Sequence, residues 1–245
     1  FPPPLTPRGK YPRNSTFGSR ITPADPDALA AEKNAVAEYV VDNYLGPGAS
    51  VFIGDGSSTF FVALHMFKRK MHATMWTNHL AIAHEFSLLP STDRGLIGME
   101  MHLAGGQVDR DLMMTYGRRA RNDVARWARE AQCVILSVRA LFPDRGPAGR
   151  EQQSLVIKQK AINAALKSGA RIVLVVDHAK LSYPNYENQP LVFPLRTSWR
   201  DLAPSENFFV VTNNDPGTVF KRNVKALREQ IMKSADRVVL VPPVP

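Results

Sequence analysis

The fold is decided at residues 52–59, Phe52-Ile-Gly-Asp-Gly-Ser-Ser-Thr59, where an apolar run passes into two glycines and three hydroxyl side chains. This order is typical of the turn between a buried strand and a helix in a parallel α/β sheet. Glycines admit a ligand close to the backbone, and the first amides of a helix have no intrahelical acceptor. The stretch therefore predicts a cradle for a phosphate or carboxylate. A tight turn with an N-cap is the alternative.

Strand-like and helix-like segments alternate on both sides of this turn. Short apolar runs without polar alternation, such as 172–176, are typical of strands that are covered on both faces. We expect strands at 50–53, 73–77, 98–104, 133–137 and 171–176, and less clearly at 191–193, 208–212 and 238–241. We expect helices at 25–46, 58–70, 79–89, 118–131, 151–167 and 218–233. The alternation predicts an α/β fold with a Rossmann-like, doubly wound, mostly parallel sheet and helices on both of its faces.

Polar and glycine-rich segments follow four of the expected strands. Ligands of open parallel sheets bind beyond the carboxyl ends of the strands, so these segments are where a site is expected. They are 54–59, 77–79 (Thr77-Asn-His79), 105–110 and 177–180 (Asp177-His-Ala-Lys180). Together they offer hydroxyls, an amide, a histidine, backbone amides and a lysine. This set suits a phosphorylated polyol, with the phosphate on Gly56–Thr59 and Lys180 as a second positive charge.

Length and composition set the class of protein. The chain has 245 residues, is 44% hydrophobic and 22% charged, and has no apolar run near the roughly 20 residues that span a bilayer. One cysteine, Cys133, excludes an internal disulfide framework and suits a reducing compartment, so we expect a cytoplasmic protein with no membrane partner. Residues 1–24 are rich in proline and glycine and predict a linker or arm, followed by one domain over 25–245. Because the chain begins at Phe1, we expect an upstream segment.

The net charge of +9 raises the possibility of nucleic-acid binding. The basic residues gather in the N-terminal arm, at 68–70, at 118–129 and at 221–228, and no known nucleic-acid signature accompanies them. Solvated helix faces are the simpler interpretation. The six histidines and Cys133 show no zinc spacing, so we expect neither a metal nor another cofactor, and Cys133 is expected to be a small buried side chain.

The order of the polar motifs resembles the C-terminal sensor domain of DeoR-type transcriptional regulators. The motifs are Gly-Ser-Ser-Thr at 56–59, Thr-Asn at 77–78, Leu-Ala-Gly-Gly at 103–106 with a further glycine at 117, and Val-Asp-His-Ala-Lys at 176–180. Upstream, Phe17, Arg20 and the pair Glu32-Lys33 match the linker and first helix of that family. The resemblance covers roughly 17–214. It implies the fold of ribose-5-phosphate isomerase and the coenzyme A transferases, a homo-oligomer, and a sugar-phosphate effector that alters DNA binding through an upstream winged helix-turn-helix, which this chain lacks.

The resemblance also implies roles for individual residues. The phosphate would be held by Gly56, Ser57, Ser58 and Thr59, and the cavity would be lined by Thr77 and Asn78, followed by His79. The backbone would approach the sugar at Gly105 and Gly106. Hydroxyls or phosphate would be bound by Asp177 and Lys180. The chain departs from the family at Gly54-Asp55, where the aspartate usually stands one residue earlier. An ionised Asp55 would repel a phosphate unless Lys180 or an arginine such as Arg139 compensates, so Asp55 is itself a candidate ligand-binding residue.

Three functions remain open at this point. The first is the effector-binding and oligomerising domain of a regulator, without turnover. The second is a sugar-phosphate isomerase-like enzyme of the same fold, with Asp55, Asp177 or Glu100 as base. The third is a protein-interaction module whose pocket is vestigial. His178 is expected to form hydrogen bonds in the first case and to act as an acid or base in the second.

Overall fold

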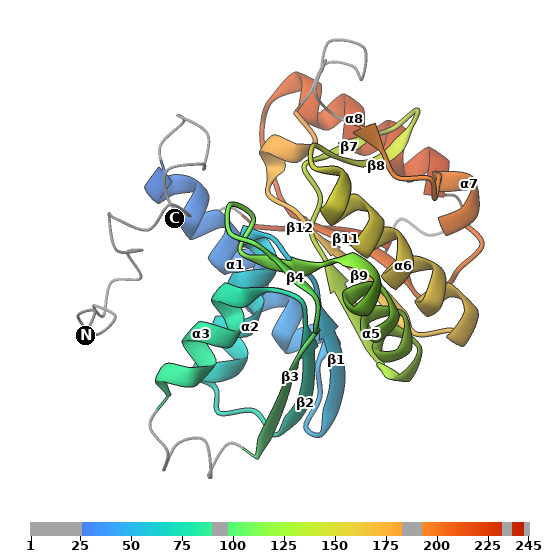
Figure 1. The fold of residues 1–245 in the computed structure, drawn as a ribbon. Helices are drawn as coiled ribbons and strands as arrows, with labels where there is room; N and C mark the ends of the chain where they lie inside the picture. Colours follow the sequence, from blue (N-terminus) through green and yellow to red (C-terminus); the bar gives the residue numbers. More distant parts are fainter. Residues whose placement is uncertain (1–25, 90–97, 183–192, 232–236, 243–245) are drawn as a thin grey trace.

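The computed structural model describes residues 26–89, 98–182, 193–231 and 237–242, and the predicted arm at 1–24 lies outside them. Seven parallel strands form the central sheet in the order β12-β11-β9-β6-β1-β2-β3 (Figure 1). In chain order these strands are β1 Ala49–Ile53, β2 Ala73–Thr77, β3 Met99–Leu103, β6 Cys133–Leu136, β9 Arg171–Val175, β11 Phe208–Asn213 and β12 Val238–Val241. The predicted doubly wound sheet is confirmed.

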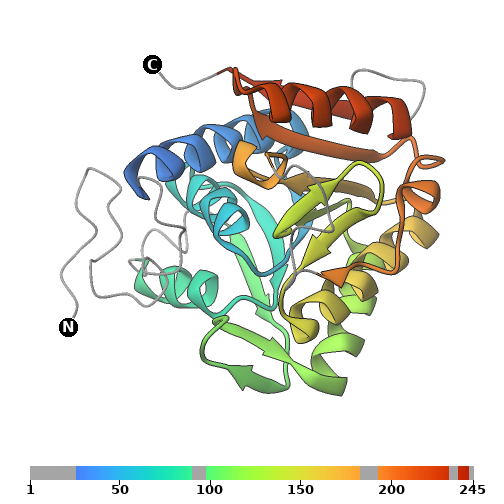
Figure 2. The ribbon, with the colours of Figure 1, turned by 90° about the horizontal axis from the view of Figure 1, so that it is seen from above.

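Helices cover both faces of this sheet, as the apolar strands require. One layer holds α1 (Pro26–Tyr44), α2 (Ser57–Lys68) and α3 (Leu80–Leu88), which share one hydrophobic core with the sheet. The other layer holds α5 (Gly117–Glu130), α6 (Gln152–Ser168), α7 (Trp199–Leu202) and α8 (Thr218–Ile231), packed on the second core. Seen from above, the sheet separates the two layers (Figure 2). Within the described ranges, no helix is both long enough and apolar enough to cross a membrane.

The strand register brings the carboxyl ends of neighbouring strands level with one another. Ile53 pairs with Thr77 on one side and with Ile135 on the other, and Thr77 pairs with Leu103. Further along, Leu136 pairs with Leu174. The segments that follow β9, β6, β1, β2 and β3 therefore lie along one continuous edge, which we call the carboxyl rim.

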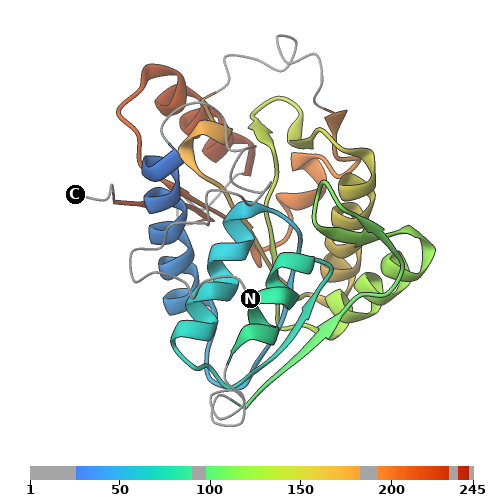
Figure 3. The same cartoon turned by 60° about the vertical axis from the view of Figure 1, so that its left-hand side comes forward.

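Two small antiparallel elements lie at this rim, and of their strands the sequence predicted only the one at 191–193, of which Phe193 lies among the described residues. Strands β4 (Gln107–Asp109) and β5 (Met114–Tyr116) form a hairpin before α5, visible beside that helix in Figure 3. It docks on the end of β2, because Thr115 donates its amide to the Asn78 carbonyl. Strands β7 (Ala140–Phe142), β8 (Gly146–Gly149) and β10 (Phe193–Pro194) form a second sheet beyond β6. Both elements therefore frame the carboxyl rim.

Candidate functional site at the carboxyl rim

The four polar segments predicted from the sequence lie on one edge of the molecule. They follow β1, β2, β3 and β9, and all of these strands are parallel. The end of β6, with Ser137 and Arg139, lies between β9 and β1. Two buried carboxylates, Asp55 and Asp177, stand on either side of it. The rim is best described as two polar centres built around these aspartates.

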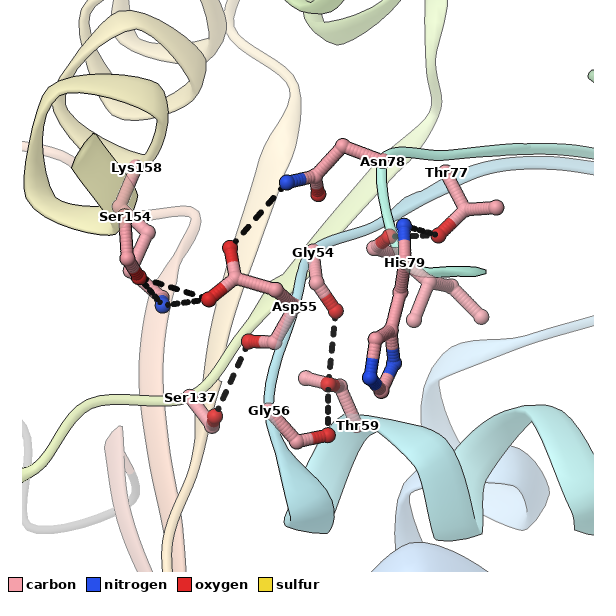
Figure 4. A network of polar contacts seen from close by, with 11 residues as sticks. Gly54, Asp55, Gly56, Thr59, Thr77, Asn78, His79, Ser137, Ser154 and Lys158 are labelled. Atoms are coloured by element: carbon pink, nitrogen blue, oxygen red, sulfur yellow. Dashed lines mark hydrogen bonds and ion pairs between the residues drawn. The ribbon is translucent and has the colours of Figure 1, made fainter. Parts of the chain in front are cut away.

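The first centre is a closed network around Asp55 (Figure 4). Lys158 Nζ and Ser154 Oγ each lie 2.6 Å from Asp55 Oδ2, and Lys158 also bonds Ser154. Asn78 donates its side-chain amide to Asp55 Oδ1 at 3.3 Å. Ser154 and Lys158 are four residues apart on α6, so both point from one helix face toward the turn after β1. Every oxygen of the Asp55 carboxylate thus accepts a hydrogen bond.

The ion pair with Lys158 keeps Asp55 ionised. Burial alone would raise the pKa of this carboxyl, but the charge and hydrogen bond of Lys158, with the hydrogen bond of Ser154, hold it below its usual value. The expectation that Lys180 or Arg139 would compensate Asp55 was wrong for the described residues, because the ion pair is with Lys158. The sequence did contain a hint of this ion pair, because Ser154 and Lys158 are four residues apart and so share one face of the predicted helix. Their partner lies about a hundred positions away, and sequence spacing does not reveal it.

The turn after Asp55 is shaped to present the first amides of α2. Gly56, the N-cap residue, has φ of +133°, and a Cβ there would lie 1.9 Å from Ser137 Oγ. The first i→i−4 bond runs from the Phe60 amide to the Gly56 carbonyl, so the amides of Ser57, Ser58 and Thr59 precede the helical ladder. The Thr59 hydroxyl is already used, since its Oγ1 lies 2.7 Å from the Gly54 carbonyl oxygen and 2.8 Å from that of Gly56. Any anion here would meet mainly backbone amides.

Thr77, Asn78 and His79 are fully buried at the end of β2. The Thr77 hydroxyl donates to the Ile53 carbonyl at 2.7 Å and accepts the His79 amide at 3.0 Å, so it joins the ends of β1 and β2. Burial lowers the pKa of His79 to about 4, which makes its ring neutral at pH 7. Asn78 Oδ1 is buried and has no hydrogen-bond partner among the described residues. Asn78 is therefore the member of this group that offers a free acceptor to the rim.

The second centre is built around Asp177, which follows β9 and is 1% exposed. Its two carboxylate oxygens have no hydrogen-bond partner within the described ranges. Two ammonium groups approach Oδ2 without reaching hydrogen-bond distance, Lys33 Nζ at 3.7 Å and Lys180 Nζ at 3.8 Å. Burial lowers the pKa of Lys180, and the carboxylate of Asp177 opposes this shift. The centre thus combines a buried acid with two cations and keeps acceptor capacity unused.

Helix α1 contacts the Asp177 centre through Glu32 and Lys33, the pair that the family resemblance assigned to the first helix. Glu32 Oε2 lies 2.6 Å from His178 Nδ1, and the Glu32 carbonyl accepts the Asn213 side-chain amide at 3.0 Å. Lys33 is 3% exposed and faces Asp177. The hydrogen-bonding role expected for His178 is present. The contribution of Lys33 was missed, although the Glu32-Lys33 pair at i and i+1 was the available signal.

Gly105 and Gly106 pack against α5 and the hairpin before it. The Gly105 amide donates to Asp123 Oδ2 at 3.0 Å, and a Cβ at Gly105 would lie 2.6 Å from Arg119 Nε. Gly106 has φ of +132°, and a Cβ there would lie 2.3 Å from the Tyr116 carbonyl oxygen. Close packing on backbone and a positive φ therefore explain Gly106, whereas a Cβ at Gly105 would meet only the flexible Arg119 side chain. Their contact with a sugar stays a prediction.

A hollow of about 340 Å³ lies at the opposite, amino edge of the sheet. Its lining includes Cys133 and Arg171, the first residues of β6 and β9. Arg171 donates from Nη1 to the carbonyl of Tyr44, the last residue of α1, so this cation caps a helix. Burial raises the pKa of the Cys133 thiol to about 12, as the expectation of an inert buried cysteine requires. The lining also includes the polar side chains of Tyr44, Gln132 and Asn207.

Known proteins resemble this chain in part. A family model described as the DeoR C terminal sensor domain matches residues 29–186. Ribose 5-phosphate isomerase from Plasmodium falciparum is similar in structure at 14% identity and a TM-score of 0.39, covering 63% of this chain and 54% of that one. The tetrameric eIF2B-beta2-delta2 complex from C. thermophilum gives 12% identity, a TM-score of 0.43, and coverage of 69% and 54%.

These likenesses differ in weight. The chain spans about half the length of the solved structures, and no curated protein matches it. The family model matches more than half of the chain, and it covers the Asp55 turn, the ends of β2 and β3, and the Asp177 centre. The chain therefore belongs to the DeoR C-terminal sensor domain family.

Proposed function

We propose that this domain binds a small phosphorylated sugar or a related anionic metabolite at the carboxyl rim and acts as the effector-binding, oligomerising part of a transcriptional regulator. The observation that carries this proposal is the set of buried acceptors at the rim that find no donor among the described residues, Asp177 Oδ1 and Oδ2 and Asn78 Oδ1. Buried polar atoms are normally hydrogen-bonded, so unused acceptors indicate a missing donor. The hydroxyl groups of a polyol are such donors.

The spacing of the two centres suits a ligand of this size. Strands β9 and β1 are separated by one strand, so their ends lie about 10 Å apart. A phosphate at the first amides of α2 would leave the hydroxyls of a five- or six-carbon chain within reach of Asp177. The turn at 54–59 would bind through backbone amides, and Asp177 would select for hydroxyl groups.

The charge of the rim also favours an anion. Lys158 neutralises Asp55, so the turn that would hold the phosphate carries no net negative charge. At the other centre Lys33 and Lys180 together exceed the single charge of Asp177. The rim therefore has one surplus positive charge, and a phosphate group would offset it.

Ligand titration tests this proposal. Ribose 5-phosphate, ribose and inorganic phosphate would each be titrated into the 245-residue chain by isothermal calorimetry. We expect the phosphorylated sugar to bind more tightly than either part, and Asp177→Asn to weaken it about tenfold or more, because one charged acceptor for hydroxyls is lost. The exposed residue Asp144 gives the matched control, Asp144→Asn, which should bind as the unaltered chain does. Absence of heat for a panel of pentose and hexose phosphates would contradict the proposal and favour an interaction module.

A sugar-phosphate isomerase-like activity is the second candidate, and the unused oxygens of Asp177 favour it. Of the three bases considered, Asp55 has a lowered pKa because of its ion pair with Lys158, which makes it a weaker base. Glu100 is exposed on β3. Asp177 is the base that would touch a bound sugar. Solvent-deuterium incorporation into ribose 5-phosphate, lost in Asp177→Asn, would establish turnover, whereas binding without exchange would support the sensor.

A further inference from the structure

The two helical layers of the molecule differ in charge. Helices α5, α6, α7 and α8 contain thirteen arginines and lysines against four acids. On the other face the described acids of α1, α2 and α3 are Glu32, Glu38, Asp42 and Glu85. They are balanced by four cations, Lys33, Lys68, and Arg69 and Lys70 directly after α2. The basic clusters at 118–129 and 221–228, far apart in the sequence, therefore lie on one side of the sheet (Figures 1 and 2).

The densest part of the basic layer is a row of arginines along α5. Arg118, Arg126 and Arg129, with Asn122 between them, are spaced by four, four and three residues, so they lie on one helix face. All three arginines are exposed, and Arg118 and Arg129 have no acidic partner among the described residues. At a rise of about 1.5 Å per residue the row is about 16 Å long. We call Arg118, Arg126 and Arg129 the arginine stripe.

The arginines of the stripe differ in what they do for the helix that carries them. Arg129 lies in the last turn, where a cation is favourable, and Arg126 forms an ion pair with Asp123. Arg118 lies in the first turn of α5, which contains no acid. Cations at a helix N-terminus oppose the macrodipole, whereas an anion bound there is favourable. The face that α5 buries consists of Ala120, Val124, Trp127 and Ala128, so packing does not require the arginines either. A partner outside the chain accounts for Arg118 better than folding does, because this arginine opposes the helix dipole and has no acidic partner among the described residues.

Helix α6 extends the same surface. It packs against α5, and Lys160 and Lys167 are exposed on its outer side. The exposed large apolar side chains of the described residues, Leu88, Leu103, Val108 and Phe193, lie on neither helix. Protein interfaces usually have an apolar core, which this surface lacks. A basic surface without apolar residues fits a polyanion of regularly spaced phosphates.

We propose that the outer face of α5 and α6 binds the phosphodiester backbone of duplex DNA without sequence preference. The two packed helices are together about 20 Å wide, and the major groove is about 12 Å wide, so the arginines reach phosphates and not base edges. This inference goes beyond the proposed function, in which a separate domain binds DNA. The sensor domain would add backbone contacts of its own to that binding.

Fluorescence anisotropy of two labelled 20-base-pair duplexes of unrelated sequence tests this proposal with the whole 245-residue chain. We expect equal affinity for both sequences and a dissociation constant that rises steeply between 50 and 200 mM salt. Each phosphate contact contributes about −0.9 to the slope of log K against log salt. The double variant Arg118→Gln, Arg129→Gln should therefore lower the slope by about 2. The matched control is Lys68→Gln, Lys70→Gln, on the opposite layer, which should leave the slope unchanged.

Three outcomes would overturn this assignment: no binding at 50 mM salt, equal loss in the control variant, or tighter binding to a polyglutamate peptide than to either duplex, which would identify an acidic protein as the partner. Circular dichroism of both variants checks that they are folded. Because the titration contains no sugar phosphate, its failure would leave the effector proposal standing. Loss of effector binding would likewise leave the DNA result intact.

Discussion

The two aspartates of the carboxyl rim occupy equivalent places and have opposite environments. Asp55 follows β1 and Asp177 follows β9, and both are buried. Asp55 accepts hydrogen bonds from Lys158, Ser154 and Asn78. Asp177 has two lysines beyond hydrogen-bond distance and no donor in the part of the chain that the structure describes. The difference separates a carboxylate that completes the fold from one that has capacity left for a ligand. It also teaches that burial of an acid does not by itself indicate its role.

Removal of Lys158 should have the largest effect. Lys158→Met leaves the Asp55 carboxylate buried without its cation, and breaking such a pair costs about 3–5 kcal/mol of unfolding free energy. The double variant Asp55→Asn, Lys158→Met should recover most of this loss. Urea denaturation gives the values, and Lys160→Met, on the exposed face of the same helix, is the control. A cost below 1 kcal/mol would remove the distinction between the two aspartates.

Acid should lower the free energy of unfolding through His79, which lies on the Asp55 side of the rim. The folded-state pKa of His79, about 4, lies below the unfolded value of 6.5, so the unfolded chain binds more protons between these values. Stability should therefore fall by about 3 kcal/mol as pH decreases from about 6.5 to about 4. His79→Gln should remove this fall in stability between the two pH values, and His84→Gln, at an exposed histidine, should leave the fall unchanged. The measurement is urea denaturation at a series of pH values.

Gly56→Ala should cost about 2 kcal/mol. Its φ of +133° is unfavourable for alanine, and the new Cβ would lie 1.9 Å from Ser137 Oγ. Ser137→Ala in the same chain should recover part of the loss by removing that oxygen. Gly46→Ala, where a Cβ would meet nothing within 4 Å, is the control. Equal effects at both glycines would show that the turn beside Asp55 is not conformationally constrained.

The smallest effect should be the coupling between Asp177 and Lys33. A double-mutant cycle with Asp177→Asn and Lys33→Met should give about 1 kcal/mol, because the charges are 3.7 Å apart without a hydrogen bond. The cycle of Asp55→Asn with Lys158→Met should give a larger value, since those groups are in contact at 2.6 Å. Equal coupling energies would contradict the view that the Asp177 centre is open.

Much of the fold was predictable because its signals are local. Apolar strands alternating with helices fixed the class, and the positions of the polar segments after β1, β2 and β9 gave the rim. The strand at 146–149 was missed because Gly146-Pro147-Ala148-Gly149 has no β-branched or aromatic residue. The strand at 140–142 was missed because three residues are too few to show a pattern. Ser154, Lys158 and Lys33 were missed because their partners are set by how α6 and α1 cross the sheet. Gly106 was predicted to contact the ligand, although its positive φ and the nearby Tyr116 carbonyl already require glycine there, and the ligand contact of Gly105 stays a prediction.

The unequal charge of the two helical layers gives the molecule an electric dipole across the sheet. A net charge speeds the approach to any polyanion, but a dipole also turns the molecule as it approaches. At physiological salt this torque acts only over about 8 Å, roughly the last three layers of water molecules before contact. The domain should therefore arrive on a charged surface with α5 and α6 foremost and α1 facing away, and it should be retained by a cation-exchange resin in that same orientation.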